Sequence, residues 1–178
     1  MRRLRRAVKR KTTGMSGKVI GFCGWAGCGK DTAADLMAKM LPGPVLRYSF
    51  AEPIKIMARQ MGWMGDKDAK GRQLLVDLGM AGRRFDEDCW LREAQDRFYR
   101  NTHCSHFVLS DVRFRNEAEW VMREGILVRV VRNGVRPLTC STEHELDGFP
   151  VSCAVANNGN LDDLHDMLYE EVMQRLYG

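Results

Sequence analysis

The apolar stretch Lys18-Val19-Ile20-Gly21-Phe22-Cys23, followed by Gly24-Trp25-Ala26-Gly27-Cys28-Gly29-Lys30-Asp31-Thr32, decides the fold of this chain. The first part is typical of a buried strand, and the second part is a glycine-rich loop. Apolar residues then recur at helical spacing, at Ala33, Leu36, Met37, Met40 and Leu41. A strand, a glycine loop and a helix in this order predict a phosphate-binding loop at the end of a buried strand.

The loop matches the P-loop pattern, Gly-x-x-x-x-Gly-Lys-Ser/Thr, at all but one position. Gly24, Gly29 and Lys30 fit the pattern, whereas Asp31 stands where a hydroxyl residue is expected and Thr32 follows one place later. Glycines let backbone N–H groups turn toward phosphate oxygens, and the start of the helix favours the same anion. We expect the loop to bind the phosphates of a nucleotide, and the alternative is an ordinary glycine turn before a helix.

The size and composition indicate one globular domain. The chain has 178 residues, of which 44% are hydrophobic, and it contains no apolar run long enough to span a membrane. Its six cysteines include no Cys-x-x-Cys pair, which argues against a zinc site. No apolar segment follows the basic start, so we expect no secretory signal and a reduced, cytoplasmic location.

The excess of positive charge lies in residues 1–17. Seven of the 28 Lys and Arg residues stand in the first 14 positions, so the rest of the chain has 21 against 23 Asp and Glu. We expect residues 1–17 to form a disordered basic tail outside the folded domain, residues 18–178. The tail would contact nucleic acid, or it is only solvated, or it precedes a natural start at Met15.

Strand and helix patterns alternate five times along the chain. This alternation predicts a three-layer α/β fold of the P-loop type, with a five-stranded parallel sheet covered by helices on both faces. The expected strands are 18–23, 45–50, 106–110, 126–131 and 151–156. The expected helices begin at Pro53, near Leu74 with an end at Gly79, after 86–88, at Asn116 with an end at Gly125, and after Asn160.

Two long connections interrupt the alternation, at residues 52–105 and 132–150. In a protein that transfers phosphoryl groups, such segments are natural places for a helical acceptor-binding insert and a short closing lid. Arg132 and Arg136 begin the second connection, where they would stabilise transferring phosphates or remain solvated. At least one of the adjacent Arg83 and Arg84 in the first connection would hold an acceptor phosphate.

Charged residues after the third strand complete the expected site. Asp111 would hold Mg²⁺ together with the Thr32 hydroxyl, or it caps the following turn. Arg113 would contact phosphate through its planar guanidinium, or it pairs with Glu117 at the surface. Asp31 would bind the metal or orient the acceptor, although an acid at a helix start is favourable without any ligand.

Longer blocks of the sequence resemble the phage deoxynucleoside monophosphate kinases. The resemblance covers roughly residues 18–176, and its specific parts are Gly-Lys-Asp-Thr at 29–32 and Ser110-Asp111-Val112-Arg113-Phe114-Arg115-Asn116-Glu117-Ala118-Glu119. Further similar blocks are Phe50-Ala51-Glu52-Pro53-Ile54-Lys55, Leu74 to Gly79 with Arg83-Arg84 and Asp88-Cys89-Trp90, Thr142-Glu143 with Leu146, and Asn157-Asn158-Gly159-Asn160-Leu161. Arg115 replaces the family's usual proline.

The resemblance implies Mg²⁺-assisted transfer of the γ-phosphoryl group of ATP to a deoxynucleoside 5′-monophosphate, which supplies nucleotides for phage DNA synthesis. It implies the catalytic residues Lys30, Asp31, Arg113, Arg132 and Arg136. It implies acceptor contacts from Lys55, Arg83, Arg84, Trp90, Asp111 and Arg113, with Asn158 and Gly159 near the adenine. The accepted base and the oligomeric state stay open, and a homodimer is the commonest choice.

Two other functions compete with this interpretation. Another small-molecule P-loop kinase, such as dephospho-coenzyme A kinase, also has an Asn-x-Gly turn after its last strand, which resembles residues 157–159. A nucleotide-dependent accessory protein that binds nucleic acid would use the basic tail, and that tail is its sole support.

Overall fold

The structure is a computed structural model that describes residues 18–66, 68–137 and 144–178. The expected tail and part of the expected lid, including Thr142 and Glu143, therefore lie outside the described residues. The elements are β1 (Lys18–Cys23), α1 (Lys30–Met40), β2 (Val45–Tyr48), α2 (Glu52–Gln60), α3 (Ala69–Phe85), α4 (Cys89–Arg100), β3 (His106–Leu109), α5 (Arg115–Glu124), β4 (Gly125–Val131), β5 (Cys153–Ala156), α6 (Leu161–Leu168), a π-helical turn η2 (Tyr169–Met173) and α7 (Gln174–Tyr177).

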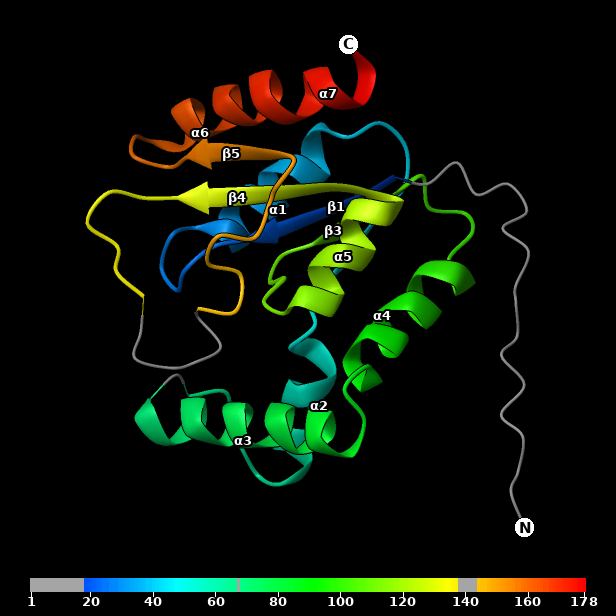
Figure 1. Cartoon of the computed structure of the whole chain (residues 1–178), viewed down its shortest axis with the longest axis vertical. Coiled ribbons are helices and arrows are strands. Elements are labelled where there is room, and N and C mark those ends of the chain that lie inside the picture. The colour runs from blue at the N-terminus through cyan, green and yellow to red at the C-terminus, as the bar shows by residue number, and fades with distance from the viewer. Residues whose placement is uncertain (1–17, 67, 138–143) are drawn as a thin grey trace.

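All five strands are parallel and form one sheet in the order β2-β3-β1-β4-β5. β1 lies in the centre, with Ile20 opposite Val108 of β3 on one side and Ile126 of β4 on the other. Helix α5 covers one face, while α1 and the C-terminal helices cover the other (Figure 1). The predicted three-layer α/β fold with a five-stranded parallel sheet is confirmed.

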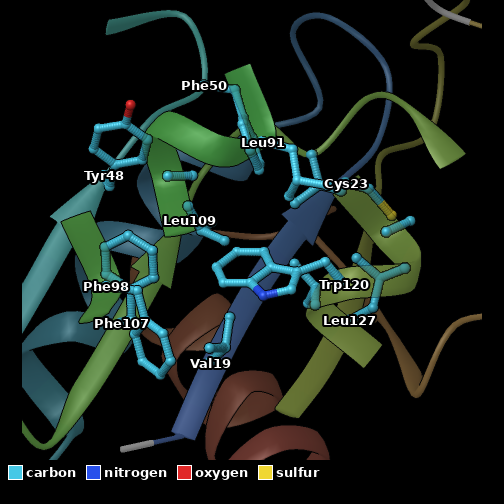
Figure 2. Close-up of a cluster of buried hydrophobic side chains, with 14 of the residues drawn as sticks. Val19, Cys23, Tyr48, Phe50, Leu91, Phe98, Phe107, Leu109, Trp120 and Leu127 are labelled. Atoms are coloured by element: carbon cyan, nitrogen blue, oxygen red, sulfur yellow. The ribbon is translucent and has the colours of Figure 1, made fainter. Parts of the chain in front are cut away.

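Both faces of the sheet are buried because neighbouring residues of each strand point into different cores. In β1, Val19 packs into the core beneath α4 and α5, whereas Ile20 packs against α1 and α6. Trp120 of α5 lies in the middle of the first core, among side chains of β1, β3 and β4 (Figure 2). Its indole is 1% exposed, so it contributes a large apolar surface to this core.

Helix α3 is longer than predicted, and the expected end at Gly79 is wrong. The helix runs on to Phe85, and both of its later glycines lie at close contacts with neighbouring helices. A Cβ on Gly79 would lie 3.2 Å from Ile54 of α2, and one on Gly82 would lie 2.4 Å from the Trp90 ring of α4. These glycines serve helix packing, which a sequence pattern does not distinguish from a helix stop.

Gly125 also differs from its predicted role, since it opens β4 directly instead of forming a turn after α5. A Cβ at this position would lie 1.9 Å from the carbonyl oxygen of Val19, so only glycine lets β4 approach β1 here. The second and fifth strands are shorter than predicted, at Val45–Tyr48 and Cys153–Ala156.

The C-terminal helix begins as predicted after Asn160, whose side chain accepts hydrogen bonds from Asp162 N and Asp163 N. Its end returns to the start of the sheet, where Leu176 accepts a hydrogen bond from the Lys18 ammonium. None of the helices that the structure describes is long and apolar enough to cross a membrane.

We predict that Trp120→Ala lowers the free energy of unfolding by about 3–5 kcal/mol, because it empties the centre of a packed core. Trp120→Phe should lower it less, since the indole N–H is buried without a hydrogen-bond partner among the described residues and phenylalanine removes that donor. Urea denaturation of the three proteins measures both effects. Equal losses in the two variants would contradict this account of the indole.

Candidate active site

The glycine loop follows β1 and ends where α1 begins, as the sequence predicts. Gly24, Gly27 and Gly29 all have positive φ angles, of 142°, 83° and 93°. These angles strain any residue with a Cβ, and Cβ atoms on Gly24 and Gly29 would also meet Val130 O at 2.4 Å and Asn157 Nδ2 at 2.2 Å. The loop thus has the open backbone and the helix start that phosphate binding needs.

Lys30 is the first residue of α1 and is only 6% exposed. Among the described residues its ammonium has one hydrogen bond, of 3.4 Å, to the Trp25 carbonyl oxygen. A buried cation with such weak compensation is suited to an anion in the loop. Asp31 and Thr32 lie exposed in the first turn of the same helix.

Asn157, which the sequence analysis does not assign to the site, supports the loop from behind. Its side-chain N–H donates to the Cys28 carbonyl at 2.9 Å, and its side chain is buried. The neighbouring Asn158 accepts a hydrogen bond of 2.7 Å from Asn133 N, so the turn after β5 joins the segment after β4. The signal for Asn157 is its place in the Asn-Asn-Gly block, beside the expected Asn158 and Gly159.

Asp111 follows β3 at the same edge of the sheet and is 9% exposed. Its Oδ1 accepts a hydrogen bond of 2.9 Å from Phe50 N, which links the ends of β2 and β3. Burial raises the pKa of Asp111, while Arg113 and a hydrogen bond from Ser49 oppose that rise and Asp31 adds to it. The charges of Arg113 and Asp31 thus act on the pKa of Asp111 in opposite directions.

The side chains at this edge are of the chemical kind that magnesium uses when it also binds substrate phosphates. No cluster of three or more His, Cys, Asp or Glu forms a metal cage within the part of the chain that the structure describes. Mg²⁺ in nucleotide sites commonly uses only one or two carboxylates and completes its shell with water and phosphate. Thr32, Asp31 and Asp111 offer one hydroxyl and two carboxylates for such a site.

The two adjacent arginines of α3 lie in different surroundings. Arg84 is exposed, whereas Arg83 points inward to the buried carboxylate of Glu117. The guanidinium of Arg83 also lies 3.4 Å from the centre of the Phe114 ring. Burial raises the pKa of Glu117 to about 7. The charge of Arg83 and the hydrogen bonds that Glu117 accepts from the backbone N–H groups of Arg113 and Phe114 act in the opposite direction.

A cavity of about 320 Å³ lies between the glycine loop, the residues after β3, the end of β4 and residues 146–148. Its walls include Trp25, Val112, Arg113, Arg132 and Leu146. Two of the expected catalytic arginines therefore line one cavity with a loop residue. Such a mixture of apolar and cationic groups suits an anionic organic ligand.

Arg129 is a further cavity residue that the sequence analysis does not single out, because it lies inside an otherwise apolar strand. Its guanidinium donates to the carbonyl oxygens of Leu146 at 2.8 Å and Phe149 at 3.0 Å. It thus holds a segment whose residues 146–148 line the cavity. Arg136 is exposed and follows Arg132 and Val135, which line the cavity, but it is not itself a lining residue.

Lys55 and Trp90 lie in the helical segment between β2 and β3. Lys55 is half-buried on α2. The Trp90 indole donates to the Gly79 carbonyl at 2.9 Å, so in this structure it joins α4 to α3. Helices α2 and α3 form a separate layer beyond one edge of the sheet (Figure 1).

No protein-family model and no curated protein sequence matches this chain. Solved structures do match: TT1252 from Thermus thermophilus has a TM-score of 0.55 at 18% identity, over 91% of this chain and 99% of that one. Shikimate kinase from Aquifex aeolicus has a TM-score of 0.51 at 14% identity, over 90% and 99%. A gluconokinase from Sinorhizobium meliloti has 0.51 at 12% identity, over 93% and 98%. The chain therefore has the same three-layer α/β fold as these three proteins, two of which are named as small-molecule kinases.

Proposed function

We propose that this protein transfers the γ-phosphoryl group of ATP to the phosphate of a deoxynucleoside 5′-monophosphate. One observation carries the proposal: the glycine loop with its buried Lys30 shares an edge of the sheet with Asp111 and Arg113. In open parallel α/β sheets, ligands bind at the carboxyl ends of the strands. The arrangement thus combines a polyphosphate site with cations beside it.

Transfer between two phosphates requires that two anions be aligned and their repulsion neutralised. Lys30 and Arg113 would do this from fixed positions, and Arg132 and Arg136 from the segment after β4. Magnesium held by Thr32 and Asp111 would supply further positive charge on the phosphates. The turn at Asn158 and Gly159 would contact the adenine.

The choice of acceptor rests on the resemblance to phage deoxynucleoside monophosphate kinases. Two of the similar blocks, 50–55 and 110–119, meet in the structure through the hydrogen bond between Phe50 N and Asp111. Lys55 ends the first block on α2, Arg84 lies on α3 and Trp90 lies on α4, and all three would contact the acceptor. In this proposal the protein supplies deoxynucleoside diphosphates for phage DNA synthesis.

The activity is tested by coupled measurement of ADP release, with ATP, Mg²⁺ and one acceptor at a time. We expect turnover with at least one of dGMP, dTMP and a methylated dCMP. Turnover with dephospho-coenzyme A alone would replace this function by the competing small-molecule kinase. Slow hydrolysis that only DNA stimulates would replace it by the accessory role.

We predict that Lys30→Ala reduces turnover by at least ~100-fold, because it removes a preorganised charge at the transferring phosphate. The matched control is Lys39→Ala, which removes an exposed lysine from the last turn of the same helix and should keep full activity. Circular dichroism checks that both variants fold. Near-normal turnover in a folded Lys30→Ala variant would contradict the role assigned to this lysine.

A further inference from the structure

Glu117 is a charged residue in a place that ordinarily holds an apolar one. It lies in the first turn of α5 and is 1% exposed. One carboxylate oxygen, Oε2, accepts hydrogen bonds from Arg113 N at 2.9 Å and from Phe114 N at 3.2 Å. The other oxygen, Oε1, binds the guanidinium of Arg83. Glu117 thus fixes the backbone of the residue that we place at the phosphates.

Arg83 reaches this carboxylate from a distant part of the fold. It belongs to α3, in the segment between β2 and β3, and its side chain is only 9% exposed. Besides Glu117, its guanidinium donates to the Glu87 carbonyl at 3.2 Å and stacks on the Phe114 ring. The guanidinium donates hydrogen bonds through its N–H groups and packs its flat face on an aromatic ring. It is therefore held by Glu117 of α5, by Phe114 just before that helix and by Glu87 at the α3–α4 junction.

A second contact joins the same two parts of the chain. The side-chain N–H of Asn116 donates to Asp88 Oδ1 at 2.8 Å and to the Glu87 carbonyl at 3.3 Å. The start of α5 is thus tied to the junction of α3 and α4 through both Asn116 and Glu117. A shift of these helices would therefore be transmitted to the loop between β3 and α5.

Electrostatics explain why the loop depends on Arg83. A buried carboxylate without its counter-ion is strongly unfavourable, and such a group takes up a proton or moves toward water. Either change weakens the hydrogen bonds that Glu117 accepts from Arg113 N and Phe114 N. Arg83 binds Glu117 through its guanidinium, and Arg113 binds Glu117 through its backbone N–H. Loss of Arg83 would then displace Arg113 by way of Glu117.

We propose that Arg83 and Glu117 are positioning residues that hold Arg113 in place for phosphoryl transfer, so that α3 controls the reaction without Arg83 binding the acceptor. The inference rests on the proposed function. It assigns to Arg83 an indirect role, in place of the acceptor contact that the sequence resemblance implies.

The kinetic test compares Arg83→Gln, Glu117→Gln and the double variant with the unmodified protein. We expect each single change to lower kcat by ~10- to 100-fold, the effect of a small misplacement, with the KM of the acceptor changed less than about threefold. Because both residues act through one linkage, the double variant should be no slower than the slower single variant. A large rise in acceptor KM for Arg83→Gln, additive with Glu117→Gln, would show direct acceptor binding and overturn the proposal.

The matched control is Arg100→Gln. Arg100 is the last residue of α4, and its Nη2 lies 3.6 Å from Asp96 Oδ2 of the same helix. Both side chains are exposed, at the end of α4 that lies away from the junction with α3, so the variant should keep the kcat and KM of the unmodified protein. Arg83→Lys keeps the charge but not the planar fork, and it should recover part of the lost kcat.

A second measurement does not depend on activity. Amide hydrogen exchange of Arg113 and Phe114, followed by NMR, should be faster in Arg83→Gln than in the unmodified protein and unchanged in Arg100→Gln. Absence of turnover with every acceptor would defeat the proposed function, while the exchange rates would still test the linkage. Unaltered exchange at Arg113 in Arg83→Gln would overturn the linkage even in an active kinase, and Arg83→Lys serves for the same comparison if the Gln variant does not fold.

Discussion

The central place of β1 in the parallel sheet is the constraint on which the rest of the site depends. With β3 on one side and β4 on the other, three carboxyl ends lie side by side at one edge. The glycine loop continues β1, Asp111 and Arg113 follow β3, and Arg132 follows β4. Residues far apart in the sequence therefore meet because the strands that precede them are neighbours. The two cores on either side of the sheet hold β1 in that place.

Much of the fold could be predicted from the sequence because its signals are local. β1 has its predicted bounds, and Asn160 caps the last helix as expected. The errors come from contacts between distant segments. Gly79 looks like a helix stop, yet it lies inside α3 beside Ile54, and Gly125 looks like a turn residue, yet it lies against β1. A pattern along the chain contains no information on which backbone will approach a glycine.

The site shows the same division between local and distant information. The positions of Gly24, Gly29 and Lys30 follow from one motif, and the structure places Lys30 at the start of α1. The sequence could not separate Arg83 from Arg84, since only tertiary packing turns one inward and leaves the other exposed. Arg129 was missed because an arginine in an apolar strand has no motif; its role comes from the carbonyl groups that fold over it.

The pairing of β1 with strands much later in the chain also bears on how this protein is made. During synthesis on a ribosome, β1 emerges first but acquires its two neighbours only after His106–Leu109 and Gly125–Val131 have followed. Closing such long segments makes folding slow and leaves apolar strands exposed meanwhile. The nascent chain thus carries the complete glycine-rich loop long before that loop has a sheet to support it.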